Sequence, residues 1–246
     1  MQRFIRSMHR HNVAGLVAAV AIGIVSLTIE NFAGQRIRLP PVDEASSDSA
    51  LKRTRDELLQ AVRGRDVEGV MRRVHPDFML DGQRKYPINR LRDTLVTGRP
   101  WHLDSSLWAV LERILSAGGA FTTTRGLELK RREFCAPYTF ATLPRIVPAV
   151  LNSEVSPWVV TIDQAPLYRT PSSNGAVIAT LSYDLVKAGS YLAPDGRLWY
   201  TVTLGDGRTG FVDPGVLRDP EDYHACFAEF EGEWLMVELG LGIRGG

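Results

Sequence analysis

The spacing of apolar residues changes along the chain, and the change divides it into two predicted regions. Apolar residues recur at helical spacing from Leu51 to Val74 and again from Leu107 to Leu115. Further along, short runs of alternating apolar and polar residues are separated by turn sequences such as "PDG" and "GDG". The pattern therefore predicts an α+β domain in residues 51–150 and a small all-β domain in residues 158–219.

Local signals indicate where the predicted helices begin and end. Gly64 suits the end of the first helix, and Asp66 can cap a second. The clearest helix lies in "DSSLWAVLERILSAGG", for which we expect Asp104 or Ser105 as the N-cap. Residues 137–157 are rich in proline and lack a clear period, which predicts a connection between the two domains.

The N-terminal segment carries an export signal. Arg3, Arg6 and Arg10 precede a run without charge from Val13 to Ile29. A basic flank followed by an apolar run is typical of a membrane anchor or a secretory signal peptide. The run is long for a signal peptide, and Asn31 is a poor −3 residue for cleavage after a small residue. We therefore predict residues 1–33 to be a signal anchor, with a cleaved signal peptide as the alternative.

This leader predicts where the rest of the chain lies. An anchor through residues 13–33 would make the protein a single-pass inner-membrane protein with residues 34–246 in the periplasm. Cleavage would instead release the chain into the periplasm as a secreted protein. Residues 34–50 are polar and contain a Pro-Pro pair, so we expect a linker between the membrane and the folded body.

Composition and motifs exclude several functions. The formal net charge is +1, whereas nucleic-acid-binding domains show a strong basic excess. The sequence contains no P-loop, dinucleotide fingerprint, nucleophile elbow or His-x-x-x-His pair. We therefore expect no nucleic-acid partner, no cofactor and no catalytic residues, and hence a protein that is not an enzyme.

The two cysteines, Cys135 and Cys226, both lie in aromatic-rich segments. An extracytoplasmic compartment permits a disulfide between them, and two buried free thiols are the alternative. The sequence favours the bridge. Two widely spaced cysteines without a histidine at ligand spacing also predict that the chain has no zinc site.

Residues 158–219 carry the most specific resemblance. A strand led by tryptophan ("WYTV"), a glycine-containing turn, "GFV" and a short helical turn follow the loop "YRTPSS". This combination resembles the bacterial SH3-like domain, which implies a five-stranded barrel that binds ligands on cell-envelope proteins. Gly210 fits such a barrel, because a side chain at a sharp bend would obstruct closure.

The resemblance also implies a ligand-binding site. Trp199 occupies the position where SH3-like domains expose an aromatic ring, and alternation places it on the face opposite Leu198 and Val202. We expect Tyr168 to supply a second aromatic wall, so that the pair could stack on a peptide or a sugar. The alternative is that Trp199 covers the barrel edge or packs on the neighbouring domain.

The remaining segments suggest a return of the chain to its first domain. Helix, "GRD", helix, "HPDF", strand weakly resembles the cone-shaped fold related to nuclear transport factor two. Residues 220–246 predict a hairpin with two apolar faces, which an SH3-like barrel does not need. We expect this hairpin to pack on the domain of residues 51–150, so that the barrel is an insertion.

The sequence therefore predicts a non-catalytic binding or scaffold protein of the cell envelope. Its SH3-like module would contact peptidoglycan or an envelope protein or peptide. The alternative is a small-molecule-binding protein or enzyme with a pocket in the cone-like domain. A cone filled by Phe78, Trp108 and Leu111 would argue against that alternative.

Overall fold

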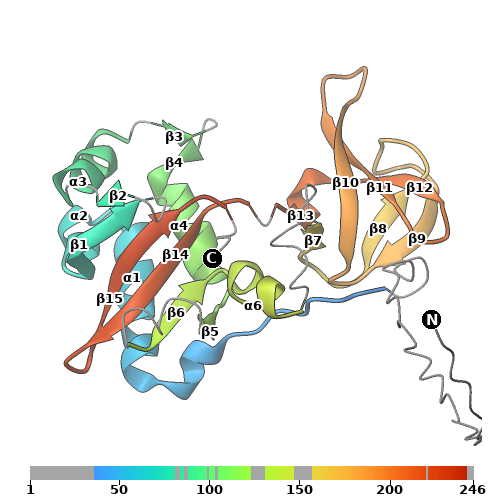
Figure 1. Cartoon of the computed structure of the whole chain (residues 1–246). Coiled ribbons are helices and arrows are strands. Elements are labelled where there is room, and N and C mark those ends of the chain that lie inside the picture. The colour runs from blue at the N-terminus through green and yellow to red at the C-terminus, as the bar shows by residue number, and fades with distance from the viewer. Residues whose placement is uncertain are drawn as a thin grey trace, which may run out of the picture.

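The chain forms two units, each built around its own sheet, as Figure 1 shows for this computed structural model. The leader predicted in residues 1–33 lies outside the described part of the chain. Within the described part, no helix is long and apolar enough to cross a membrane. The structure describes residues 36–80, 84–85, 88–98, 100–102, 105–122, 131–146, 157–219 and 221–242.

The first unit, called here the α+β unit, contains a six-stranded sheet among the described residues. Its strand order is β2-β1-β15-β14-β6-β5, in which β1 and β15 are parallel and the other neighbours are antiparallel. A separate two-stranded ribbon, β3–β4, lies beside it. The strands are β1 (Val74–Leu80), β2 (Arg84–Lys85), β3 (Pro100–His102), β4 (Ser105–Ser106), β5 (Ala120–Thr122), β6 (Glu133–Ala136), β14 (His224–Phe230) and β15 (Glu233–Gly240).

Helices cover both faces of this sheet. Those on one face share a core with the strands, in which Leu58 and Leu111 lie with Phe134, Phe227 and Trp234. The last helix covers the opposite face, where alternate strand residues form a second, smaller cluster. The helices are η1 (Glu44–Ser47), α1 (Ser49–Arg63), α2 (Val67–Met71), α3 (Ile88–Thr97), α4 (Leu107–Ser116) and α6 (Tyr138–Ile146).

Two helix assignments from the sequence need correction. The N-cap of α4 is Ser106, whose Oγ accepts from the amide of Ala109 at 3.3 Å, and not Asp104 or Ser105. The strand β4 continues through Ser106, so the helix begins only after it. The predicted connection of residues 137–157 begins with the helix α6, despite Pro144 within it. Burial compensates for the poor helix formers of α6, because Ala141 packs on the sheet while Tyr138 and Leu143 pack on Leu39 and Val159.

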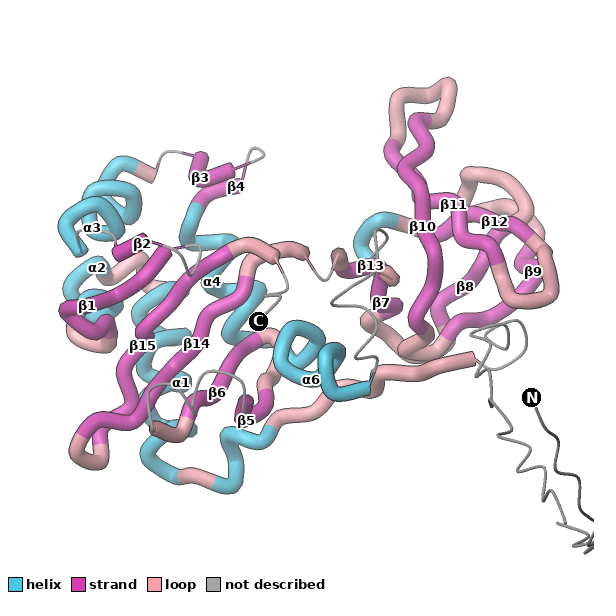
Figure 2. The backbone as a smooth tube through the Cα atoms, viewed as in Figure 1, coloured by secondary structure: helices cyan, strands magenta, loops and turns pink. Residues whose placement is uncertain are grey.

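The second unit, called here the β unit, is a strongly bent seven-stranded sheet (Figure 2). Its order is β13-β7-β10-β11-β12-β8-β9, and each neighbouring pair is antiparallel. Val202 lies in its core with Tyr200 packed against it, which is the face that alternation predicted. The elements are β7 (Trp158–Val160), β8 (Ala165–Tyr168), β9 (Val177–Leu181), β10 (Leu185–Leu192), β11 (Leu198–Thr203), β12 (Thr209–Val212), η3 (Pro214–Val216) and β13 (Leu217–Arg218).

The predicted linker of residues 34–50 is wrong over the part that the structure describes. Leu39 is only 1% exposed, and its amide donates to the carbonyl of Tyr183 at 2.7 Å. Arg36 Nε donates to Asp184 Oδ1 at 2.8 Å. The segment therefore lies against the β unit before it enters the α+β unit at η1 (Figure 1). The segment is mostly polar, so its composition does not reveal that a few apolar side chains hold it against the β unit.

The C-terminal hairpin, β14 and β15, lies in the middle of the first sheet. β15 pairs with β1, and β14 pairs with β6. The β unit therefore stands, in sequence, between two strands that are neighbours in the sheet. This is the return of the chain that the two apolar faces of residues 220–246 predicted.

We predict that Gly210→Ala destabilises the β unit. A Cβ at this position would lie 2.7 Å from both Leu167 Cγ and the Tyr168 carbonyl oxygen, because β12 and β8 approach closely there. Crowding of this kind costs about 1–3 kcal/mol. Urea unfolding measures the change. Gly64→Ala is the control, since its Cβ would meet only ordinary contacts, the nearest at 3.4 Å. Equal effects of the two substitutions would contradict the packing argument.

We also predict an acid-sensitive contribution from Asp48, the N-cap of α1. The Leu51 amide, followed by Arg132, lowers the pKa of Asp48 below its ordinary value of 3.8. A lowered folded-state pKa stabilises the fold above the unfolded-state pKa, and this contribution is lost as pH falls through the folded-state value. Asp48→Ala should therefore cost about 1 kcal/mol at neutral pH and less in acid.

Urea unfolding at neutral pH and in acid measures this difference. Asp56→Ala is the control, because the contact of Asp56 among the described residues is an exposed ion pair with Lys52 on the same helix. Such pairs contribute about 0.3–0.5 kcal/mol. A loss for Asp48→Ala that stays constant through the acid range would refute the assigned role of the carboxylate.

Candidate functional site

The two aromatic residues predicted to bind ligand lie together. Tyr168 on β8 and Trp199 on β11 contact each other edge to face, with ring centroids 6.0 Å apart. Trp199 is only 4% exposed, however, so the prediction that its ring is presented to a ligand is wrong. The alternation along β11 correctly predicted the face of the sheet on which Trp199 lies, but it could not show which other side chains bury the ring. The ring packs outside the core cluster of the β unit, as the alternative interpretation allowed.

Two further aromatic residues extend this pair into a strip across four strands. Tyr191 on β10 lies opposite Trp199, and Phe211 on β12 lies opposite Tyr168. Tyr191 and Phe211 also contact each other edge to face, at 5.1 Å between centroids. We call these four residues the aromatic strip. Sequence reasoning missed Tyr191 and Phe211, because the strand register that aligns them is not visible in the sequence.

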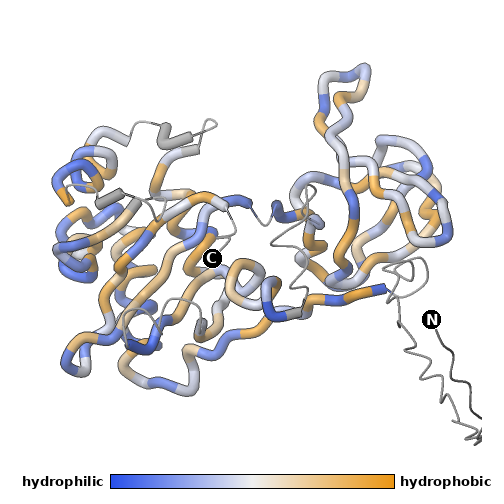
Figure 3. Tube along the Cα trace, viewed as in Figure 1, coloured by the Kyte–Doolittle hydropathy of each residue, from blue (hydrophilic) through white to orange (hydrophobic). Residues whose placement is uncertain are grey.

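The exposed part of this region lies on the hairpin of β10 and β11, which projects beyond the sheet (Figure 2). Tyr191 is 37% exposed, and Leu192 and Leu198 are 70% and 45% exposed. Leu192 and Leu198 are cross-strand partners on the face opposite the aromatic strip. Figure 3 shows hydrophobic stretches along this projecting hairpin. An apolar pair held in solvent on a rigid hairpin is a candidate contact surface.

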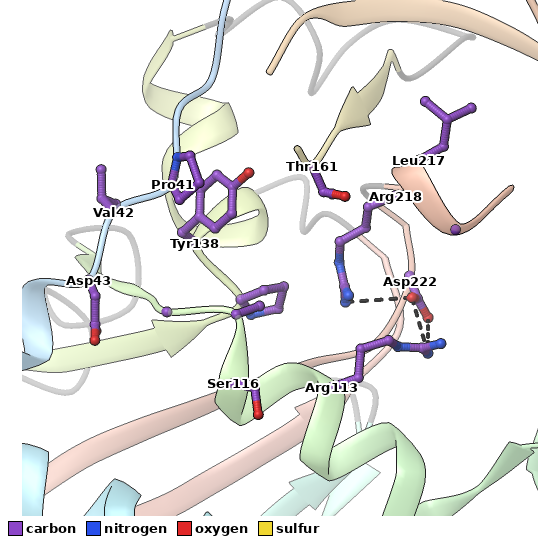
Figure 4. Close-up of a pocket in the computed structure, with 14 residues that line it drawn as sticks. Pro41, Val42, Asp43, Arg113, Ser116, Tyr138, Thr161, Leu217, Arg218 and Asp222 are labelled. Atoms are coloured by element: carbon purple, nitrogen blue, oxygen red, sulfur yellow. Dashed lines mark hydrogen bonds and ion pairs between the residues drawn. The ribbon is translucent and has the colours of Figure 1, made fainter. Parts of the chain in front are cut away.

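A second candidate site is a cleft between the two units, with a volume of about 590 Å³ (Figure 4). Arg113 of α4 and Arg218 of β13 converge on Asp222 there. Asp222 Oδ2 lies 3.2 Å from Arg113 Nη2 and 3.5 Å from Arg218 Nη2. Pro41, Val42 and Leu217 line other parts of the wall. The cleft therefore combines an apolar wall with two cations that share one carboxylate.

Two buried polar groups belong to the same cleft. The Arg218 side chain is 8% exposed and donates to the carbonyl of Tyr223 at 2.7 Å. Burial lowers the pKa of Arg218, but a guanidinium remains charged in proteins. Tyr138, at the start of α6, is 4% exposed, and burial raises its pKa to about 12. Its hydroxyl has no hydrogen-bond partner among the described residues.

No pattern in the sequence indicates this cleft. Its residues come from five separate segments, and each segment reads as an ordinary turn, helix end or strand. Asp222 in particular lies in the short stretch that leads from the β unit into β14. Only the return of the hairpin to the first sheet brings these segments together.

Cys135 and Cys226 form a disulfide between β6 and β14. The two residues are direct cross-strand partners, and their Cα atoms are 4.1 Å apart. Beside them lie two buried ionisable residues, with His224 Nε2 3.6 Å from Glu238 Oε1. The ring of His224 also stacks on Phe140 of α6 at 3.6 Å.

Donor atoms that could suit a metal ion gather around this disulfide. The Cys226 sulfur lies within 4.8 Å of donor atoms of His224 and Glu238, and a carboxylate oxygen of Glu133 lies within 4.8 Å of each of the two sulfurs. Metal ligation by cysteine requires the thiolate, and both sulfurs are bonded to each other. The oxidised protein therefore presents these sulfurs as a structural link between strands and not as thiolate ligands.

Side chains fill the described interior of the α+β unit. Phe78, Trp108 and Leu111 are all buried in its main core cluster. Trp108 Nε1 donates to the carbonyl of Leu95 at 3.0 Å, so its polar atom is also satisfied. This packing argues against the alternative of a ligand cavity inside this unit, and the cleft described above lies at its edge instead.

Comparison with protein-family models, with curated proteins and with solved structures finds no match to this chain. The resemblances to the SH3-like and cone-shaped folds therefore rest on the quoted residues alone. Function has to be argued from the geometry of the aromatic strip, the projecting hairpin and the cleft.

We predict that removing the disulfide with Cys135→Ala and Cys226→Ala lowers the free energy of unfolding by about 2–4 kcal/mol, since it closes a long loop in the unfolded chain. The cysteines are 91 residues apart. Urea unfolding of the oxidised protein, the reduced protein and the double variant measures the effect, and the last two should agree. Alkylation of both thiols without reductant would contradict the bridge.

Proposed function

We propose that this chain is a non-catalytic binding or scaffold protein of the cell envelope. In this proposal, residues 158–219 form an SH3-like module that contacts peptidoglycan or an envelope protein or peptide. Residues 51–150 and the C-terminal hairpin form a cone-like domain that carries the module.

The exposed apolar hairpin is the observation that carries the proposal. Leu192 and Leu198 are two large hydrophobic residues held in solvent on one face of an antiparallel pair of strands, and Tyr191 is partly exposed on the other face. Exposed apolar residues are ordinary when scattered, whereas a cluster on a projecting element marks an interaction site. Trp199 pairs with Tyr191 next to the Leu192–Leu198 pair near the tip of this hairpin, and its buried ring does not itself meet the bound molecule.

The shape and chemistry of the hairpin favour a protein or peptide partner over a sugar. A sugar stacks on one exposed aromatic face but also requires polar groups beside it. Here the exposed neighbours of Tyr191 include two leucines on the opposite face, which are suited to an apolar side chain of a protein. Peptidoglycan, which contains both sugar and peptide, remains the second partner to test.

The disulfide supports the proposed compartment. Such bonds form and persist in oxidising environments and are rare in the cytosol. Together with the basic flank and apolar run of residues 1–33, a disulfide between β6 and β14 favours export of the folded units. We therefore place residues 34–246 on the periplasmic side of the inner membrane in this proposal.

We predict that the double variant Tyr191→Ala and Leu198→Ser loses partner binding by about tenfold or more, because truncating an interface anchor costs at least 1–2 kcal/mol. The full chain in mild detergent is cross-linked in envelope membranes and, separately, sedimented with purified sacculi. Val96→Ser is the control, since Val96 is 66% exposed on α3 of the other unit. Absence of capture in both assays, or equal capture of wild type and double variant, would reject the proposal.

A further inference from the structure

The strand β10 has an unpaired edge along most of its length. One of its edges pairs with β11 from Lys187 to Leu192. Among the described residues, its other edge pairs with β7 only at Leu185 and Val186. The outer edge of residues 187–192 therefore meets no further strand in the part of the chain that the structure describes, and we call it the open edge. An unpaired row of N–H and C=O groups is a template for an additional strand.

The register shows which backbone groups of the open edge point outward. Along an antiparallel strand, the N–H and C=O groups of successive residues point alternately toward one neighbour and toward the other side. The Ala193 amide donates to the Arg197 carbonyl at 2.9 Å, and this bond points toward β11. Since the pairing of β10 with β11 runs without a shift, every second residue before Ala193 also points inward. The residues of the open edge that point outward are therefore Ala188, Ser190 and Leu192.

The open edge lacks the features that usually prevent further pairing. Natural edge strands carry charges, proline or a bulge for this purpose. The five residues from Ala188 to Leu192 contain no charge and no proline, and their pairing with β11 is regular. Lys187, at the beginning of the open edge, is its one charged residue. Gly189 and Ser190 are exposed as well as Leu192, so solvent reaches this stretch.

The sequence of the open edge is complementary to itself. Its first residues, Ala188 and Gly189, are small, whereas its last residues, Tyr191 and Leu192, are large. Ser190 lies between them and points outward, so it can lie on a twofold axis. In an antiparallel pair of two copies about this axis, Tyr191 lies opposite Gly189 of the second copy. Leu192 likewise lies opposite Ala188 of the second copy, so each large side chain meets a small one.

We propose that two copies of this chain associate through the open edge, as an antiparallel pair of β10 strands centred on Ser190. Such an interface is isologous, because the same residues serve both copies. The outward N–H and C=O groups of Ala188, Ser190 and Leu192 all find partners in this register. Gly189 fits the arrangement, since a glycine inside a strand often marks a close approach of another backbone, and an aromatic ring can cover it.

This inference goes beyond the binding function proposed above. It uses the edge of the projecting hairpin, whereas the proposed binding uses the faces of that hairpin. Pairing would join the hairpins of two copies into one ribbon, with Leu192 and Leu198 of both copies on the same face. The dimer would therefore enlarge the apolar surface offered to an envelope partner, although its formation does not require that partner.

Sedimentation equilibrium of the purified full chain in density-matched mild detergent measures the association. We expect dimers whose fraction rises with protein concentration. Ser190→Lys and Ser190→Glu each place two like charges opposite each other at the axis, and each should raise the dissociation constant about fivefold. Ser173→Lys is the matched control, because Ser173 is exposed in the loop between β8 and β9 of the same unit and lies outside the open edge.

Mixing the two Ser190 variants tests the register. Opposite charges then face each other at the axis, so the mixture should form heterodimers. A tagged Ser190→Lys chain should capture about fivefold more untagged Ser190→Glu than untagged Ser190→Lys. A tagged Ser173→Lys chain should capture Ser173→Glu and Ser173→Lys equally. A general effect of the substitutions on folding would lower capture by both Ser190 variants and would not be reversed by mixing them.

Three results would overturn the inference. The first is a wild-type chain that stays monomeric up to about 100 μM, which would leave the open edge to an extended peptide of another protein. The others are equal dissociation constants for the wild type and Ser190→Lys, and equal capture of the two Ser190 variants. Because these measurements contain no envelope material, dimer formation supports the inference even if the hairpin captures no partner, and the two proposals can fail separately.

Discussion

The position of β14 and β15 in the middle of the first sheet is the constraint on which the rest of the structure depends. Because β14 and β15 lie in the middle of the sheet, the first unit is complete only once these two strands have been added. The chain between β6 and β14 therefore leaves the sheet and later returns to it. The disulfide joins Cys135 and Cys226 at this point, where the inserted β unit departs and where it comes back. One covalent bond therefore fixes the attachment of the whole inserted unit.

The junction between the units follows from the same constraint. The segment around Leu39 crosses from the β unit to η1, and the stretch before β14 crosses in the other direction. Contacts there include buried polar side chains, Tyr138 and Arg218, as well as apolar ones. Interfaces between units of one chain are commonly more polar than cores. This polarity gives the cleft between the units its charged and hydroxyl-bearing wall.

Features determined by local sequence could be predicted, and features determined by neighbours could not. The period of α1 and α4, the cap at Asp66 and the alternation along β11 agree with the structure, because each depends on residues within a few positions. The burial of Trp199, the docking of Leu39 and the cleft depend on which distant segments become adjacent. The packing of the C-terminal hairpin within the first unit could be inferred, because a hairpin with two apolar faces has to bury both faces against other parts of the protein.

Some of the departures from complete packing and complete hydrogen bonding lie on the projecting hairpin and at the junction between the units. Within the part of the chain that the structure describes, neither the buried Tyr138 hydroxyl at the junction nor the buried Trp199 Nε1–H of the projecting hairpin has a hydrogen-bond partner. Leu192 and Leu198 remain in solvent on that same hairpin. Each feature lowers the stability of the free protein, and selection for stability alone would remove it. Native proteins retain such features where function requires them, which is why the projecting hairpin is the surface on which the proposed binding is to be tested.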